Sequence, residues 1–189
     1  MNKNLLLKII KIKCLKHIYI ICFYFFNFTD ISLAQLEKKK VLGMLEGRHW
    51  VLNTNEFLKL EEGTDDILID IAGDTTLINY LRFRALEALA LYPTEKTADF
   101  LEMTIENKIS TFARRGFETF RRGFKKIKPE RVKKIAIRLL KHQNANIRIS
   151  AARTLHSMDP FEFKKFLKSE PSAWVRKEAQ KQINSTQQK

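Results

Sequence analysis

Cysteine is nearly absent from the sequence. The 189 residues contain two cysteines, Cys14 and Cys22. Both fall within residues 1–34, an N-terminal segment with the features of a removable leader, so the rest of the chain has no thiol. Disulfides, thiol catalysis and cysteine-ligated zinc are therefore excluded for residues 35–189, and their stability must come from the packing of apolar side chains.

Other patterns that carry chemistry are missing as well. Residues 35–189 contain three histidines, His49, His142 and His156, and no two have the i, i+4 spacing of a metal-binding helix. The glycines form no phosphate-binding loop, and no serine has the surroundings of a nucleophile elbow. The sequence therefore predicts a non-enzymatic protein with no catalytic residue, no cofactor and no metal.

Residues 1–34 are predicted to be a signal peptide. They consist of a basic stretch, an apolar run over residues 18–28 and a small-x-small pattern made by Ser32 and Ala34. The apolar run is shorter than the roughly 20 residues that a membrane-spanning helix needs, although a retained anchor stays as the alternative. Cleavage after Ala34 would start the mature chain at Gln35. The abundance of Lys, Ile, Asn and Phe points to a bacterium, and thus to a periplasmic or extracellular location.

Positive charge is concentrated in the C-terminal part of the chain. The net charge of the whole chain is +14. Residues 113–189 contain 21 basic and 6 acidic residues, whereas residues 35–77 contain 5 and 9. Such a surplus favours an acidic protein, an anionic envelope component such as lipid headgroups or polysaccharide, or a nucleic acid as partner. Export makes nucleic acid the least favoured of these, and leaves room for peripheral membrane contact.

A short pattern recurs four times with a period near 30 residues. Each copy begins with an apolar residue, often followed by arginine, and continues with small or apolar residues at helical spacing. The copies begin at Leu81, Phe112, Ile147 and Val175, which are 31, 35 and 28 residues apart. Two helices fill a unit of this length, and neither can bury its apolar stripe without a neighbour. Stacked pairs of helices are therefore predicted.

The clearest copy is the third, with Ile147, Arg148, Ala151, Ala152 and Leu155. It resembles the HEAT family, in particular the short HEAT-like repeats first noted in phycobilisome lyases, whose first helix begins with Val-Arg and continues into paired alanines. The resemblance covers about residues 65–184, and the second copy departs from it because Ala113 replaces the arginine. It implies an all-α fold, a short right-handed α-solenoid of helix-turn-helix repeats. It also suggests a lyase-like enzyme as an alternative, which the predicted export and the lack of cysteine disfavour.

Helix periodicity and proline positions agree with this interpretation. Second helices are predicted over residues 94–107 and 129–142, and the four prolines stand where helices begin. The sequence thus divides into four segments: a signal peptide (1–34), a divergent helical N-terminal cap (35–77), HEAT-like repeats (78–184) and a disordered tail (185–189).

The helix predicted over residues 111–126 separates phenylalanine from positive charge. At 100° per residue, its four phenylalanines share an arc of about 140° with Gly116 and Gly123, and six cations occupy the opposite arc. These cations are Arg114, Arg115, Arg121, Arg122, Lys125 and Lys126. We expect the apolar arc to be core, with Gly116 allowing a neighbouring helix to come close. The cationic arc is interrupted only by Glu118 and is predicted to bind an acidic partner; a solvated face is the alternative.

Further cations are predicted to enlarge this basic surface. The next helix contributes Lys133, Lys134, Arg138 and Lys141. The repeat arginines Arg148 and Arg176, together with Arg153, are expected to continue it along the following helices.

Overall fold

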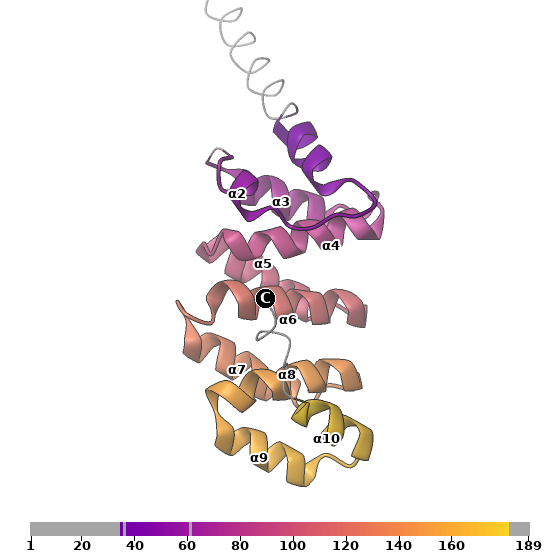
Figure 1. Cartoon of the computed structure of the whole chain (residues 1–189), viewed down its shortest axis with the longest axis vertical. Coiled ribbons are helices and arrows are strands. Elements are labelled where there is room, and N and C mark those ends of the chain that lie inside the picture. Colours follow the sequence, from indigo (N-terminus) through magenta and orange to yellow (C-terminus); the bar gives the residue numbers. More distant parts are fainter. Residues whose placement is uncertain (1–34, 36, 61, 182–189) are drawn as a thin grey trace, which may run out of the picture. The chain divides into compact units, whose positions relative to one another are not determined.

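The computed structural model describes residues 35, 37–60 and 62–181, and every regular element within them is a helix (Figure 1). The predicted all-α class is therefore confirmed for this part of the chain. The predicted signal peptide and the predicted C-terminal tail lie outside the described residues. No helix in the described ranges is long and apolar enough to cross a membrane.

The chain divides into two compact units between Met44 and Leu45, inside the range predicted as a cap. In the first unit, the described residues 37–44 are helical. The second unit holds the labelled helices, which are α2 (Thr54–Phe57), α3 (Thr64–Gly73), α4 (Asn79–Ala88), the 3-10 helix η1 (Leu89–Leu91), α5 (Glu95–Ile105), α6 (Ser110–Phe124), α7 (Pro129–Leu139), α8 (Ala145–Met158), α9 (Pro160–Ser169) and α10 (Ala173–Gln180).

Local sequence explains where these helices begin. Pro129 and Pro160 occupy the first positions of α7 and α9, where the missing N–H removes no helical hydrogen bond. The Asp159 side chain caps α9 by accepting a hydrogen bond from the backbone N–H of Glu162 at 3.1 Å. The helices predicted over residues 94–107 and 129–142 correspond to α5 and α7, which end earlier than predicted. The last residues of the predicted ranges form tighter turns with i to i−3 hydrogen bonds.

Helices in the second unit pack mainly on their neighbours in sequence. The most extensive contacts join α3 with α4, α5 with α6, and α7 with α8. A second series of contacts joins α4 to α6, α6 to α8 and α8 to α10. Figure 1 shows α4, α6, α8 and α10 following one another in this order. The candidate site described below lies on α6 and α8, which belong to this second series of contacts.

The recurring apolar positions form the core. Leu81, Phe112, Ile147 and Val175, which begin the four copies, are all buried. Four positions later stand Ala85, Gly116, Ala151 and Ala179, which are buried too. The periodicity therefore identified the packed side of α4, α6, α8 and α10 correctly.

Glycine allows α6 to approach its neighbours closely. A Cβ atom at Gly116 would lie 2.9 Å from Cγ2 of Thr104 on α5, and one at Gly123 would lie 3.0 Å from the backbone oxygen of Ala90 in η1. Both distances are shorter than normal carbon contacts. The close helix approach predicted at Gly116 is thus confirmed, and its partner is α5.

The arginine of the repeat pattern has a structural role that the sequence did not reveal. Arg82 donates from Nε to the carbonyl oxygen of Ala72, near the C-terminal end of α3. Arg148 donates to the carbonyls after α7, and Arg176 to those after α9. Each guanidinium satisfies carbonyl groups that have no helical partner. All three guanidinium nitrogens of Arg148 and one of Arg176 thus donate within the chain, and the proposed part of these two arginines in the binding surface stays a prediction.

Candidate functional site

The apolar side of α6 holds the six predicted cations in place. Phe112, Phe117, Phe120 and Phe124 are all nearly inaccessible to solvent, and Phe120 stacks on Phe124 with ring centroids 4.8 Å apart. Burial of four aromatic rings fixes the rotation of the helix, at roughly 1.5–3 kcal/mol for each ring. The predicted division of α6 into an apolar and a basic side is confirmed, and the basic side faces away from the core.

Three of the six cations are bound to neighbouring groups by charge or by stacking. Arg114 forms an ion pair with Glu118 one turn later, at 3.0 Å. Arg122 pairs with Glu87 of α4, also at 3.0 Å. Arg115 lies over the ring of Phe83, with its guanidinium carbon 4.6 Å from the ring centroid. Arg115 thus joins α6 to α4, and only part of its side chain is accessible.

The other three cations are less constrained. Lys125 donates a hydrogen bond to the hydroxyl of Ser157 on α8, at 2.9 Å. Arg121 is partly buried and Lys126 is exposed, and neither has a hydrogen-bond or carboxylate partner within the described residues. Arg121 is therefore the partly buried arginine of α6 that has neither a carboxylate nor an aromatic ring as its partner within the described residues.

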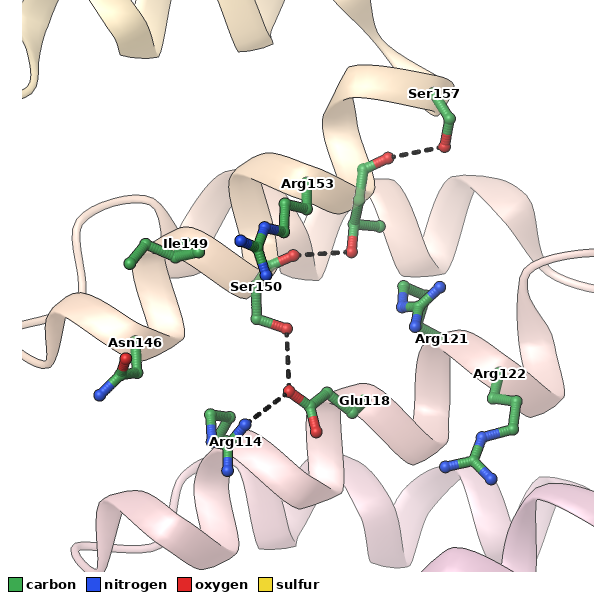
Figure 2. A pocket seen from close by; sticks show the side chains of 10 residues that line it. Arg114, Glu118, Arg121, Arg122, Asn146, Ile149, Ser150, Arg153 and Ser157 are labelled. Carbon is green, nitrogen blue, oxygen red and sulfur yellow. Dashed lines mark hydrogen bonds and ion pairs between the residues drawn. The ribbon is translucent and has the colours of Figure 1, made fainter. Parts of the chain in front are cut away.

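Arg121 lies in a groove between α6 and α8 (Figure 2). The groove has a volume of about 240 Å³ and is open to solvent. Its charged lining comes from Arg114, Glu118, Arg121, Arg122 and Arg153. Four guanidinium groups and one carboxylate make the groove strongly positive, which is the field that attracts an anion.

Two side-chain hydrogen bonds define how α6 and α8 lie beside the groove. Ser150 donates to Glu118 at 3.5 Å, and Lys125 donates to Ser157 at 2.9 Å. Both contacts join residues 32 positions apart, so the two helices run in the same direction. Arg121 stands between these two contacts, and Figure 2 shows its guanidinium in the space between the helices.

The wall formed by α8 is mostly polar and uncharged. Asn146, Ser150, Thr154 and Ser157 line it at intervals of four, four and three residues, so they share one face of the helix. Thr154 donates to the Ser150 carbonyl at 2.9 Å, and Ser157 donates to the Thr154 carbonyl at 3.1 Å. These bonds fix the hydroxyl groups beside the arginines.

Arg153 is the one charged residue that α8 contributes to the groove. Its Nε and one terminal nitrogen donate to the carbonyl oxygen of Glu178 on α10, at 3.0 and 2.7 Å. A second, longer contact reaches the Glu178 carboxylate at 3.4 Å. Arg153 therefore contributes positive charge to the groove while it holds α10 against α8, and it matches the predicted extension of the basic surface.

Comparison of the chain with family models, with curated proteins and with solved structures finds no match. The site is therefore interpreted from its own geometry. No group of three or more metal-ligating side chains occurs within residues 35, 37–60 and 62–181.

None of the four cations predicted to enlarge the basic surface lines the groove; these are Lys133, Lys134, Arg138 and Lys141. Arg131 contacts three carboxylates of α5, those of Glu95, Asp99 and Glu102. The hydrogen bond with Asp99, followed by that with Glu102, raises the pKa of Arg131 above its usual value. Arg138 likewise pairs with Glu106 at 2.5 Å. Lys133 pairs with Glu130 of its own helix, whereas Lys134 has no hydrogen-bond or carboxylate partner within the described residues, so the positive charge of α7 is neutralised only in part.

Sequence reasoning missed the contribution of α8. The polar row at 146, 150, 154 and 157 repeats with helical spacing, and this pattern was visible in the sequence. The acidic partners Glu87 and Glu178 gave no such signal, because they lie on other helices at distances in sequence that no motif records.

Proposed function

We propose that the chain is an exported, non-enzymatic scaffold whose helix pairs form a short right-handed α-solenoid of HEAT-like repeats. Its basic α6 face binds an acidic partner, either a protein or an anionic component of the cell envelope. The recurrence of buried residues at the same position of α4, α6, α8 and α10 supports the repeat architecture. The successive contacts between these four helices support it as well.

The observation that carries the binding function is the state of Arg121. Its guanidinium is partly buried in a groove with three further arginines and a single carboxylate, and it has no counterion within the described residues. Hydrogen bonds between charged groups are about twice as strong as neutral ones. An anion that enters the groove would satisfy Arg121 and reduce the repulsion among the arginines, whereas Arg131 and Arg138 of α7 already have carboxylate partners.

Reversing the charge of the α6 face tests this function. We expect Arg114→Glu, Arg121→Glu and Arg122→Glu combined in one protein to lower affinity for the true ligand at least about tenfold, because each lost charge-assisted contact costs about 1 kcal/mol or more. The salt dependence of binding should also become weaker. Retention on an acidic protein, on anionic vesicles and on an acidic polysaccharide would be measured at low and at physiological salt.

A matched variant on other helices separates a site from simple net charge. Lys164, Lys168 and Lys177 are exposed residues of α9 and α10, and their replacement by Glu changes the net charge equally. A second α6 variant has glutamine at positions 114, 121 and 122. It removes the positive charges without adding carboxylates that would repel Glu118 or Glu87. Equal loss of binding in the α6 variants and in the lysine control would contradict a specific α6 site.

Export predicts a defined N-terminus. We expect protein isolated from its native host to begin at Gln35, because the small-x-small pattern ends at Ala34 and the preceding apolar run is short. Intact-mass spectrometry of the isolated protein measures this directly. A full-length species retained in the membrane would contradict the proposed export.

A further inference from the structure

The two walls of the α6/α8 groove differ in chemistry, and their geometry restricts the form of an acidic ligand. On one wall, Arg114 and Arg121 of α6 are seven residues apart, so they share one face of the helix at a separation of about 10 Å along its axis. On the other wall, α8 presents the uncharged row that includes Asn146, Ser150 and Thr154. A ligand that uses both walls needs negative charges about 10 Å apart and a polar, uncharged backbone.

The uncharged wall favours a peptide over other anions. A peptide has a backbone N–H and a C=O group at nearly every residue, and both must find partners when they leave water. The exposed side-chain amide of Asn146 supplies both a donor and an acceptor, and the Ser150 and Ser157 oxygens can accept from a peptide N–H, while guanidinium groups recognise carboxylates. The groove lining contains no aromatic ring, and its one large apolar side chain is Ile149. It therefore offers little surface for the C–H face of a sugar ring or for an acyl chain.

The spacing of the arginines also restricts the peptide conformation. In polyproline II, residues three apart lie on the same side of the chain and about 9 Å apart, close to the separation of Arg114 and Arg121. In a β-strand, residues three apart point to opposite faces, and residues two apart are separated by only about 7 Å. Polyproline II is the extended form that presents two carboxylates at the spacing of the α6 arginines.

We propose that the α6/α8 groove binds an acidic peptide segment of a partner protein in the polyproline II conformation, with carboxylates three residues apart contacting Arg114 and Arg121. This inference rests on the proposed function and specifies its ligand. Arg121 has its donors available, since no described residue binds them. Arg114 keeps its contact with Glu118 and still has donors for a ligand carboxylate, because a guanidinium carries five N–H groups.

Two peptides of identical composition test the spacing. One carries two glutamates separated by two prolines, and the other carries two adjacent glutamates flanked by the same prolines. We expect the purified protein to bind the spaced peptide about tenfold more tightly, because only this peptide reaches both arginines and a second charge-assisted contact is worth about a factor of ten. Fluorescence anisotropy of labelled peptides at low and physiological salt gives both affinities.

Two single substitutions test whether the groove causes the preference for the spaced peptide. Arg121→Gln should remove the preference for the spaced peptide while leaving the melting temperature nearly unchanged, since the Arg121 side chain has no hydrogen bond or ion pair within the described residues. Lys126→Gln removes the same charge from an exposed position outside the groove. It should weaken binding of both peptides equally, by less than about threefold, and keep the preference.

The remaining outcomes distinguish this inference from the proposed function. Equal affinity for both peptides, with equal effects of Arg121→Gln and Lys126→Gln, overturns the groove inference but leaves an acidic partner in place. The groove inference is also overturned, and the proposed function kept, if neither peptide binds but phosphatidylglycerol vesicles or polygalacturonate bind in a manner that depends on Arg121. If none of these probes binds, both the groove inference and the proposed function are wrong.

Discussion

Replacing Glu170 by alanine should lower the free energy of unfolding by about 3 kcal/mol, the cost of removing one partner from a buried ion pair. The Glu170 side chain is 3% exposed and accepts hydrogen bonds from Nε and a terminal nitrogen of Arg148, at 2.8 and 3.0 Å. It also accepts the backbone N–H of Ser172 at 3.2 Å. Alanine leaves the largely buried Arg148 with backbone carbonyls alone. Chemical denaturation measures the loss.

An exposed ion pair provides the control for this experiment. Glu130 pairs with Lys133 on α7 at 2.9 Å, but its side chain is 81% exposed. Glu130→Ala should therefore change stability by less than about 1 kcal/mol. Similar losses from the two substitutions would show that Glu170 and Arg148 are not a buried pair in solution.

The same pair makes stability depend on pH in a predictable direction. The hydrogen bond from Arg148 holds the pKa of Glu170 below its usual value, and the N–H of Ser172 adds to this. The unfolded chain therefore binds more protons than the folded chain as pH falls below about 5, so the stabilisation is lost toward acid. Between about pH 6 and pH 3, wild type should lose more stability than Glu170→Gln, which has no carboxylate at this position.

Gly116→Leu should destabilise the protein by about 1–3 kcal/mol, as expected for an added side chain in a well-packed interface. Even the Cβ atom would lie 2.9 Å from Cγ2 and 3.2 Å from Cβ of Thr104. Thr104 has little freedom to move, because its hydroxyl donates to the Phe100 carbonyl at 2.9 Å and its side chain is buried. Thermal unfolding monitored by circular dichroism gives the change.

Gly73 provides a matched position for the same substitution. It is the last residue of α3 and is exposed, and the atom nearest to a Cβ placed there would be a ring carbon of Phe100 at 4.0 Å. Gly73→Leu should leave stability unchanged or raise it slightly, since leucine favours helix more than glycine does. An unchanged melting temperature for Gly116→Leu would mean that α5 and α6 pack loosely.

Helix starts and the buried side of α6 were predictable because they depend on local chemistry. The spacing of Phe112, Phe117 and Phe120 identifies one helical face, and Pro160 after Asp159 identifies a helix start. The role of Arg148 was not predictable in this way. Its partners are carbonyls that become available only when α7 ends beside α8, and Glu170 comes 22 residues later without any motif.

The site was predictable in part for the same reason. A single helix sufficed to group Arg114, Arg121 and Arg122, because their spacing places them on one face. Whether each cation is free depends on neighbours from other helices, such as Glu87 for Arg122. Glu118 is the one carboxylate that interrupts the cationic arc of α6, and the structure adds Glu87 of α4 as a second carboxylate near these cations.

The arrangement of contacts also bears on how the chain folds. The most extensive contacts join helices that follow each other directly, such as α5 with α6 and α7 with α8. Closing short loops costs little entropy, and proteins with such a low contact order reach the native state quickly. Each pair of helices can therefore form during synthesis, before the remaining helices are present. Rapid collapse of this kind keeps the phenylalanines of α6 from long exposure to water.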